Sequence, residues 1–523
     1  MLARSRAYKI NSMKVSPERS PLVDTSSKPI PVLGSTSPLM SITAGAIYRD
    51  AVPQDASTED QTAADAPVLK GLSHRLAIFT KSSPDFSRLW PSVSHEHGQP
   101  PLAVLRPASE DEVAAAVRFC TTSQPPIPFS IRSGGLDPAG RSRTPDGQGL
   151  VIDMRSVDSM VIAEDRKTVI VGGGVICGRL VHFLDDNGLA TPTAFSGRVG
   201  YVSWACSGGY SCLSGKYGLG VDQIEAGRVV LADGRIVDTD DAHADPDVLW
   251  ALRGAGAGIV GVVVQLRIKV YPRPPILAGH VIFPLAGSAA LFGKLGELNQ
   301  RDLPDGFAGD VMIVRPPGTD GIVDLFFHWI LKDDKSDMEE AYEYLKQLES
   351  LGTPISSSVS ETTPRAFIDT IPNPDIYRPL VFFMRQCDVA GWSHELGEIL
   401  AGREIPFQAN AVIVHSGHGA IVRERPDACF RDRPRHLMLG FVGAGPRDDA
   451  RLQRASKDWV VGLDRDVREA GLALPSQYMT FVEPLEGAGL RYYGAEGLER
   501  VKCLKERLDP TNRFPQNTPD LGD

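Results

Sequence analysis

The stretch IRSGGLDPAGRS, residues 131–142, ends a strand-like run and turns at Ser133–Gly135. Glycine carries no Cβ atom, so two glycines in succession let the backbone come close to a bulky neighbour. A single leucine, Leu136, then stands inside a turn of Asp, Pro, Ala and Gly. The pattern predicts that this turn approaches a ligand, with an apolar side chain at the point of contact.

Two more glycine-dense turns follow, at 197–211 and 254–261, and each lies at the end of a strand-like segment. One such turn, taken alone, is best read as an ordinary tight turn. Three of them together indicate a site built from loops, in which exposed backbone N–H groups bind a pyrophosphate. The stretch 197–220 holds so many glycines that we expect loops and no helix there.

The sequence Gly256-x-Gly258-x-x-Gly261 also matches the dinucleotide motif GxGxxG. A Rossmann site needs a strand before this motif and a helix after it, so that the helix N-terminus can bind the pyrophosphate. Here a helix-like segment, Asp247–Arg253, precedes the motif and an alternating strand, Val262–Val270, follows it. The order is reversed, which argues against a Rossmann site.

A series of motifs around these turns carries a family resemblance. In order they are IRSGGLDPAGRS, DGQGLVIDM, VGGGVICGRL, GYVSWACSGGYSCLSGKYGLGVDQI, DGRIV and DVLWALRGAGAGIVGVVVQLRIKVYP, with YYG and LERVKCLKERLDPTNRFPQNTP near the end. The chain resembles the FAD-linked oxidoreductases of the berberine-bridge-enzyme-like group, which have the vanillyl-alcohol-oxidase (PCMH-type) FAD-binding fold. The resemblance covers residues 70–272 and 478–519, while the middle matches only loosely, at SGHGAIVRERPDACFRDR.

The resemblance implies an α+β fold with two domains, a PCMH-type FAD-binding domain and an α/β substrate domain with an antiparallel sheet. We expect a disordered or targeting tail at 1–68, the FAD-binding domain at 69–272 and the substrate domain at 273–470. The C-terminal segment, 471–523, is expected to return to the FAD-binding domain. The tail is predicted from a composition rich in Ser, Pro, Thr, Ala and Asp without periodicity.

The resemblance also places residues at the FAD. The loop Ser133–Asp137 is expected to wrap the pyrophosphate. A second loop, defined by Gly200, Ser207, Gly208, Gly209 and Tyr210, is expected to follow the flavin and ribityl chain. Gly261 and Val263 are expected to meet the adenine side. Gln516 is expected to reach back toward the flavin. The full set of expected cofactor contacts is Arg132, Ser133, Gly134, Gly135, Leu136, Asp137, Ser142, Ser196, Gly200, Ser203, Ser207, Gly208, Gly209, Tyr210, Gly261, Val263 and Gln516.

Two positions depart from the family in a way that concerns how FAD is held. Many members tether the flavin through a histidine directly after the Arg-Ser-Gly-Gly run and through a cysteine shortly before the second glycine-rich stretch. Leu136, which has no nucleophilic atom, and Ser196 stand at these positions. Cys206 and Cys212 lie further along the chain and do not match the second anchor. The resemblance therefore implies non-covalent FAD.

Flavin oxidation needs a hydrogen that leaves as hydride, and often a base that takes a proton from a neighbouring O–H or N–H group. Tyr478 is the first candidate base, because the resemblance places it facing the flavin, but a positive charge would have to lower its pKa. His418 is the second candidate, with His415 on the opposite side of a strand. A buried, backbone-bonded tyrosine and a loop histidine without function are the alternatives. No third ligand accompanies the two histidines, so no metal site is expected.

Composition limits the partners. The net charge is −10 with both signs interspersed, which argues against nucleic acid as a partner. No run of about 18 apolar residues predicts a membrane span. The seven cysteines form no CxxC pair, so we expect neither a disulfide framework nor a zinc site. The compartment is left open: the cytoplasm is favoured because no apolar segment directly follows the basic N-terminus, and secretion is the alternative.

The sequence therefore predicts an oxidoreductase that passes hydride from a small organic substrate to non-covalent FAD, with O2 as the expected acceptor. The substrate is expected to be an alcohol, an amine or an intermediate of secondary metabolism. The lost tethers leave a dehydrogenase as one alternative. A flavin-fold cyclase, another non-redox enzyme of secondary metabolism, and a homologue without redox turnover are the others.

Overall fold

Ordered structure begins earlier than the sequence indicates. The computed structural model describes residues 56–521, except for 71, 73–75, 93–98, 138, 145–146, 301–302, 305, 333–334, 372–379, 431–432, 482–486 and 516–520, all within one of the chain's two units, Thr43–Asp523. Helix α2 (Glu59–Asp65) lies before the tail boundary expected at residue 68. Its cap, in which Thr58 accepts the Gln61 N–H, uses the same polar residue types as a disordered segment, so composition alone did not reveal it.

The opening stretch leaves the end of strand β3 (Phe129–Arg132), which pairs in parallel with β4 (Leu150–Asp153). β4 also pairs in parallel with β2 (Ala103–Arg106), and β1 (Ala77–Phe79) completes this four-stranded sheet. Between β2 and β3 runs α4 (Glu110–Thr122), with short helices α3 (Phe86–Leu89), η1 (Pro67–Leu69) and η2 (Met154–Ser156) nearby in the chain. The sequence pattern Ser109-x-x-Glu112 predicts the start of a helix, and α4 begins there, with Ser109 Oγ accepting the Glu112 N–H.

A five-stranded sheet follows, antiparallel throughout, in the order β5-β6-β10-β8-β9. Its strands are β5 (Met160–Ile162), β6 (Thr168–Gly172), β8 (Ile224–Val230), β9 (Ile236–Asp238) and β10 (Val262–Lys269). The helices are α5 (Cys177–Asp186), α6 (Tyr201–Cys206), α7 (Ser214–Tyr217), α8 (Gly220–Gln223) and α9 (Pro246–Leu252), and β7 (Leu189–Ala190) pairs with β11 (Tyr271–Pro272). Within residues 225–238 the sequence GRVVL, then Ala-Asp-Gly, then RIVD predicts a hairpin, and β8 and β9 confirm it.

Residues 197–220 are not loops throughout, so that prediction was wrong. α6 lies in this stretch and contains no glycine, and it buries Tyr201 and Trp204. Most of the glycines lie outside the helices, although Gly215 lies in α7 and Gly220 begins α8, and Gly208 and Gly209 have φ values of +112° and +85°. Their number over the whole stretch hid a short apolar helix between two of them.

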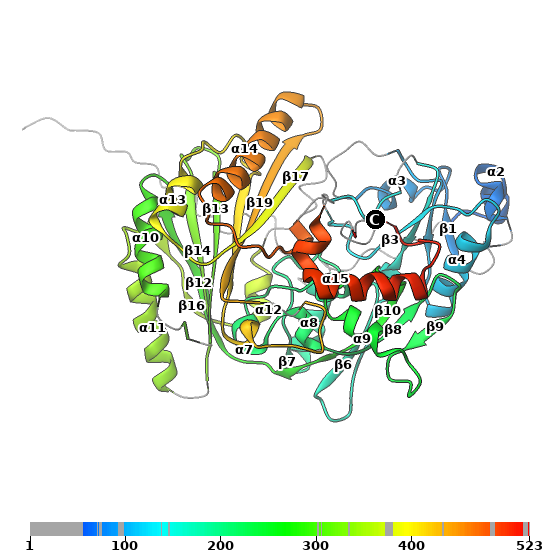
Figure 1. Cartoon of the computed structure of the whole chain (residues 1–523), viewed down its shortest axis with the longest axis horizontal. Helices are drawn as coiled ribbons and strands as arrows, with labels where there is room; N and C mark the ends of the chain where they lie inside the picture. Colours follow the sequence, from blue (N-terminus) through cyan, green and yellow to red (C-terminus); the bar gives the residue numbers. More distant parts are fainter. Residues whose placement is uncertain are drawn as a thin grey trace, which may run out of the picture. The chain divides into compact units, whose positions relative to one another are not determined.

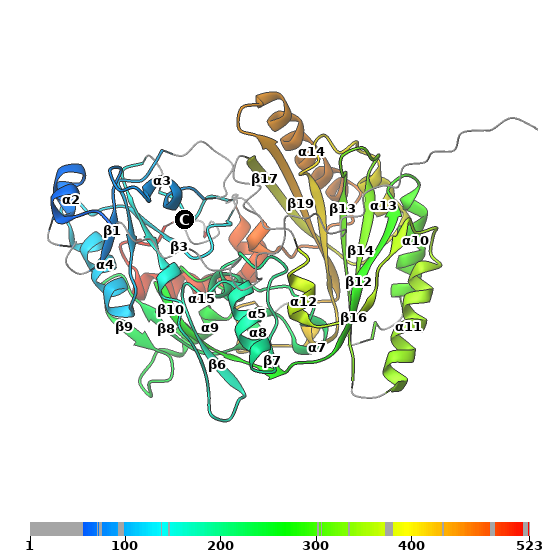
Figure 2. The ribbon, with the colours of Figure 1, turned by 180° about the vertical axis from the view of Figure 1, so that it is seen from behind.

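The largest sheet has the order β15-β12-β14-β13-β18-β19-β17, with β16 also paired to β12, and all its pairs are antiparallel. Its strands are β12 (Ile276–Pro284), β13 (Phe307–Val314), β14 (Ile322–Ile330), β15 (Ser356–Ser357), β16 (Ser360–Thr362), β17 (Leu380–Val389), β18 (Ala411–Gly417) and β19 (His436–Pro446). Helices α10 (Ser288–Asn299), α11 (Lys335–Glu349), α13 (His394–Ala401) and α14 (Ala450–Glu469) cover one face and enclose the main hydrophobic core (Figures 1 and 2). The remaining helices of this part are α12 (Pro364–Ile368), η4 (Gly419–Val422) and η5 (Met479–Phe481).

Helix α15 (Ala488–Leu508) brings the end of the chain back to the third glycine-rich turn (Figure 1). The Tyr492 hydroxyl donates to the Gly254 carbonyl at 2.5 Å, and the Tyr493 hydroxyl donates to the Ala255 carbonyl at 3.1 Å. These bonds fix the turn from the C-terminal side. None of the described helices has the length and hydropathy that a membrane crossing requires.

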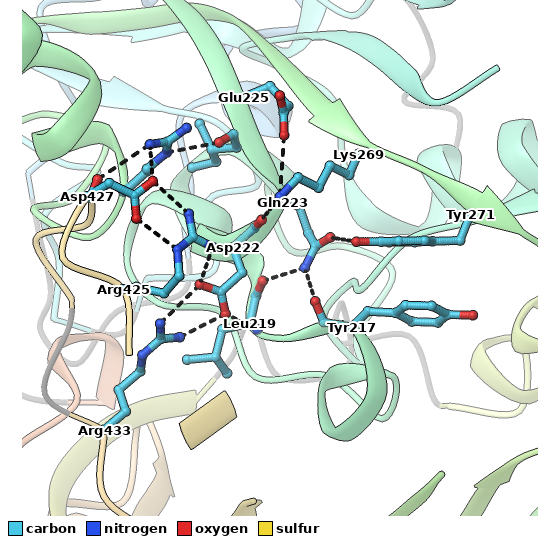
Figure 3. A network of polar contacts seen from close by, with 12 residues as sticks. Tyr217, Leu219, Asp222, Gln223, Glu225, Lys269, Tyr271, Arg425, Asp427 and Arg433 are labelled. Carbon is cyan, nitrogen blue, oxygen red and sulfur yellow. Dashed lines mark hydrogen bonds and ion pairs between the residues drawn. The ribbon is translucent and has the colours of Figure 1, made fainter. Parts of the chain in front are cut away.

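The buried carboxylate of Asp222, on α8, ties the five-stranded sheet region to the loop after β18 (Figure 3). Arg433 donates to both of its oxygens, at 2.8 and 3.1 Å, and Arg425 donates to one of them at 3.0 Å. The Leu219 N–H completes the set at 2.8 Å. Since both arginines belong to the loop after β18, this carboxylate holds that loop against α8.

We expect Asp222→Asn to lower the free energy of unfolding by about 3–5 kcal/mol, because it leaves the buried Arg433 guanidinium without its counter-charge, whereas Arg425 keeps its pair with Asp427. Asp233→Asn is the matched control, since Asp233 pairs with Arg235 on the surface, and it should cost less than about 1 kcal/mol. Urea unfolding followed by circular dichroism measures both. Small, equal losses would contradict the role given to Asp222.

Candidate active site

Backbone turns that are far apart in the sequence meet where the opening stretch turns. A Cβ atom on Gly134 would lie 2.4 Å from the Arg198 carbonyl oxygen and 2.6 Å from the Gly200 nitrogen. A Cβ atom on Gly200 would lie 2.3 Å from Ser133 Oγ, and this hydroxyl donates to the Gly173 carbonyl at 3.1 Å. A real Cβ atom cannot approach backbone so closely. Glycine is therefore required where these turns touch.

Two buried hydroxyl groups beside these turns, Ser142 Oγ and Ser196 Oγ, have no hydrogen-bond partner among the described residues. Leaving a buried polar group unpaired costs about 1–3 kcal/mol, so such groups point to a polar ligand. Both serines belong to the set expected to contact FAD. Hydroxyl donors and turn N–H groups suit the phosphate and ribityl oxygens of FAD, so the residues present fit this cofactor.

The side chain of Arg132 has a structural partner. Its Nη2 atom donates to Asp153 at 3.0 Å, and its Nη1 atom donates to the Trp90 carbonyl at 3.0 Å. Burial lowers the pKa of Arg132 to about 10, against the opposing effect of Asp153. Burial disfavours the Asp153 carboxylate, but Arg155 and Arg132 hold its pKa well below the usual range. The side chain thus braces the end of β3, and Nε is the guanidinium nitrogen that has no hydrogen-bond partner among the described residues.

The second predicted flavin loop meets Tyr478, although the two are far apart in the sequence. The Gly209 N–H donates to the Tyr478 hydroxyl at 3.2 Å. A Cβ atom on Gly208 would lie 2.7 Å from the ring carbon Cε2 of Tyr478. The ring of Tyr478 also meets that of Tyr210 edge-on, with 5.0 Å between the centroids. The structure thus brings the predicted loop and the predicted base together.

Leu136 lies against the face of the largest sheet that does not carry the main core. It is partly buried and packs on an apolar cluster that includes Phe382. Asp137 accepts the Arg141 N–H at 2.7 Å, and the Arg141 guanidinium donates to the Met479 carbonyl at 3.2 Å. The residue at the family's histidine anchor therefore makes an apolar contact with the substrate sheet.

A histidine–aspartate pair lies on the largest sheet close to the second flavin loop. His415 Nδ1, on β18, and Asp310 Oδ2, on β13, are 3.0 Å apart, and both residues are buried. The His415 ring stacks on the rings of Tyr210 and Phe195, with centroid distances of 5.3 and 5.7 Å. Asp310 Oδ1 accepts the Ser416 N–H at 3.2 Å. Because a carboxylate accepts, Nδ1 of His415 carries the proton, and Nε2, which bonds to no described residue, presents a lone pair.

Tyr478 does not meet the electrostatic requirement for a base. It is buried, and burial raises its pKa, while the charge of Arg141 opposes this shift only weakly. The lowered pKa that a tyrosine base requires is therefore not found. The reason is tertiary: the phenol is enclosed by aromatic rings and its oxygen accepts the Gly209 N–H. Tyr478 fits the alternative weighed from the sequence, a buried tyrosine bonded to backbone.

His418 has both ring nitrogens engaged. Nε2 lies 2.7 Å from the Phe307 carbonyl, which only accepts, so Nε2 carries the proton. Nδ1 lies 3.2 Å from Ser416 Oγ and accepts from that hydroxyl. Burial also lowers the pKa of His418, which favours the neutral ring. His418 therefore has no lone pair left for a substrate, and the residue with one is His415, three positions earlier.

The other residues expected to contact the cofactor differ in what they contact in the structure. Ser203 Oγ and Ser207 Oγ donate to carbonyls within α6. A Cβ atom on Gly261 would lie 2.3 Å from the Val230 carbonyl, so this glycine serves the pairing of β10 with β8, and Val263 belongs to the core beside it. Gln516 lies outside the described residues. Within those residues no group of three or more His, Cys, Asp or Glu could hold a metal ion.

Comparison with known proteins shows which family the chain belongs to. A family model for an FAD binding domain matches residues 101–240. The FAD-linked oxidoreductase aurO of Gibberella zeae is 31% identical over 511 residues, which cover 97% of this chain and 98% of that protein. This chain belongs to the FAD-linked oxidoreductases. (R)-6-hydroxynicotine oxidase of Paenarthrobacter nicotinovorans is a further relative of this FAD-linked oxidoreductase, 35% identical over 220 residues, 41% of this chain and 47% of the oxidase.

Solved structures confirm the predicted α+β fold of this FAD-linked oxidoreductase. The crystal structure of 6-hydroxy-D-nicotine oxidase from Arthrobacter nicotinovorans matches with a TM-score of 0.74 at 23% identity, covering 85% of this chain and 98% of that one. Berberine bridge enzyme in complex with (S)-reticuline matches with a TM-score of 0.74 at 19% identity, covering 87% and 99%. Both likenesses show the fold that the resemblance to the berberine-bridge-enzyme-like group implies.

We expect Gly134→Ala to abolish FAD retention, because the added Cβ atom would separate the turns that meet at Gly200. Gly188→Ala is the control: Gly188 has a positive φ, +67°, so an alanine there strains the backbone, but its Cβ atom would meet nothing within 4 Å. The flavin absorption band of the purified proteins, relative to protein absorbance, measures retention. A Gly134→Ala protein that keeps its flavin would show that the contact between the turns is not needed.

Proposed function

We propose that this FAD-linked oxidoreductase oxidises a small organic substrate with non-covalently bound FAD, and that His415 takes the proton. One observation carries the proposal. The buried His415–Asp310 pair lies beside the second flavin loop, with Nε2 of the histidine left without a described partner. Such a pair is the usual arrangement of a proton acceptor whose orientation and tautomer are fixed by a carboxylate.

The chain holds FAD mainly through backbone. The turn Ser133–Gly135 offers N–H groups, and Ser142 and Ser196 offer unpaired hydroxyls. Leu136 can make only apolar contact, and the Cys206 thiol lies fully buried in the core of the five-stranded sheet, where burial raises its pKa. Without a tether, affinity rests on these hydrogen bonds and on burial. FAD, when bound, supplies the acceptor for the hydride that leaves the substrate.

The proton path begins at His415 Nε2. Asp310 accepts the Nδ1 proton and so fixes the tautomer in which Nε2 is the acceptor. An O–H or N–H proton of the substrate then passes to Nε2, and the imidazolium that forms is stabilised by the Asp310 carboxylate. The rings of Tyr210 and Phe195 hold the plane of the imidazole and keep water from that part of the site. Removing a proton of this kind favours departure of the adjacent hydrogen as hydride.

The substrate face is apolar around this pair. Leu136, Met312 and Ile413 lie in one apolar cluster on the same sheet. We infer a substrate with an apolar body and one ionisable O–H or N–H group next to the C–H or N–H that is oxidised. O2 is the proposed acceptor, which the oxidase names of two relatives support. Reoxidation by another acceptor would make the enzyme a dehydrogenase.

Acid precipitation tests how the flavin is held. Because neither Leu136 nor a nearby thiol can form the tether, we expect FAD to pass into the supernatant when the protein is precipitated with acid. The yellow colour of supernatant and pellet, read by absorbance, is the measurement. A tethered flavoprotein treated in parallel serves as control, and flavin that stays in the pellet would contradict the proposal.

Substitutions distinguish His415 from Tyr478 as the base. We expect His415→Gln to slow anaerobic flavin bleaching by about 10²- to 10⁴-fold, because the proton acceptor is lost. Asp310→Asn should also slow bleaching strongly, since the amide permits the wrong tautomer. Tyr478→Phe, which keeps the ring packing, should change the rate by less than about tenfold.

Stopped-flow absorbance under nitrogen measures these rates, with flavin content checked in each variant. Fast bleaching by His415→Gln together with slow bleaching by Tyr478→Phe would return the role of base to the tyrosine. Absence of bleaching in the wild-type protein with a broad panel of alcohols, amines and phenols would favour a non-redox role.

A further inference from the structure

The segment 474–478, which leads from α14 to the flavin turns, is hydrogen-bonded to strand β17. Ser476 Oγ donates to Asp388 Oδ2 at 2.7 Å, and the Tyr478 N–H donates to Gln386 Oε1 at 2.9 Å. Gln386 and Asp388 both lie on β17, the last strand in the order of the largest sheet. Since their positions differ by two, both side chains project from the same face of the strand. One face of β17 therefore holds this segment through side chains.

The amide of Gln386 is held in one orientation by Asp388. Gln386 Nε2 donates to Asp388 Oδ1 at 2.5 Å. A carboxylate only accepts, so the amide nitrogen faces Asp388 and the amide oxygen is left to face the Tyr478 N–H. Both side chains are buried, where an unpaired polar group is costly. Asp388 thus makes Gln386 an acceptor at the position of the Tyr478 backbone.

Tyr478 connects this acceptor to the second flavin loop. Its backbone N–H bonds to Gln386, and its hydroxyl accepts the Gly209 N–H at 3.2 Å. Its ring also lies so close to Gly208 that a Cβ atom there would be 2.7 Å from the ring carbon Cε2. A carboxylate, an amide and a tyrosine, all buried, therefore lead from β17 to the backbone of the loop.

The neighbouring strand leaves space for this connection. Gly440, on β19, pairs with Gln386 across the two strands. A Cβ atom on Gly440 would lie 3.3 Å from the ring carbon Cδ1 of Phe481, which is tighter than ordinary van der Waals contact. The Phe481 ring in turn packs on that of Tyr478, with 6.1 Å between the centroids. The missing side chain thus lets η5 lie close to the sheet, within reach of Gln386.

We propose that Gln386, oriented by Asp388, is a positioning residue for FAD, which acts through Tyr478 to set the second flavin loop. Neither Gln386 nor Asp388 belongs to the residues expected to contact the cofactor. The inference rests on the FAD site proposed above and does not depend on which side chain takes the proton. It gives the Tyr478 hydroxyl a role as the acceptor that holds the Gly209 amide.

The experiment uses the full-length, FAD-loaded protein, and flavin fluorescence after serial dilution gives the Kd for FAD. Gln386→Met keeps a side chain of similar length and removes both hydrogen bonds. Asp388→Asn lets the Gln386 amide turn, because an asparagine can donate as well as accept, so that two donors can meet at the Tyr478 N–H. Gln453→Met is the matched control, since Gln453 bonds to two carbonyls at and just after the end of β19.

We expect the Kd for FAD to rise by about fivefold or more in Gln386→Met and in Asp388→Asn, and by less than about twofold in Gln453→Met. Tyr478→Phe should also raise the Kd, because it loses the acceptor of the Gly209 N–H. In that background Gln386→Met should add less than about twofold, since the connection to the loop is already broken. Hydrogen exchange in peptides that contain Gly209 should be faster in Gln386→Met and unchanged in the control.

The melting temperature of each variant separates positioning from a merely structural role. A lower melting temperature with an unchanged Kd would overturn the inference, and so would two factors that multiply in the double variant. Asp388→Asn carries the same test if Gln386→Met does not fold. A wild-type protein that binds no FAD would overturn the proposed function together with this inference, whereas FAD bound equally by the wild type and Gln386→Met would overturn the inference alone.

Discussion

The rest of the site depends on the missing side chains at Gly134 and Gly200, which let two turns touch through backbone. Gly200 is also the N-cap of α6, and Ser207 is its C-cap. Because the buried helix α6 connects the two turns, the position of the first turn also determines the position of the second loop and of Tyr210 at its end. A single steric constraint thus places both predicted FAD loops, and it also sets the ring on which His415 stacks.

Cofactor binding and proton transfer are built on different elements. FAD is expected to rest on turn backbone, which depends little on side-chain identity as long as glycines remain. The proposed proton acceptor, His415, and its partner Asp310 lie on neighbouring strands of the largest sheet. Substitutions there can change the chemistry without disturbing the turns. The two parts must then be held at fixed positions relative to each other. The Asp222 carboxylate connects them, because it binds Arg425 and Arg433 of the loop after β18 (Figure 3). This arrangement explains why the FAD half of the sequence shows ordered motifs and the middle does not.

The parts that could be predicted from sequence are those fixed by local chemistry. Ser109 caps α4 as its spacing indicates, and the turn at Gly134 is strained for any other residue. The parts that were missed are fixed by strand register and burial. Asp310 and His415 are 105 positions apart and become neighbours only because β13 pairs with β18. Burial of Tyr478 could not be read from Tyr-Met-Thr, and it shifts the pKa of the phenol away from the direction that a base requires.

Burial has opposite consequences for the two candidate bases because they change charge in opposite directions. A phenol that loses its proton becomes an anion, and the charge of Arg141 only partly offsets the loss of water around Tyr478. A neutral imidazole that gains a proton becomes a cation, and His415 has the Asp310 carboxylate 3.0 Å away to receive it. The same exclusion of water that raises the pKa of the tyrosine strengthens the interaction of the imidazolium with its carboxylate. An enclosed site of this composition therefore favours a base that starts neutral and has a fixed anion behind it.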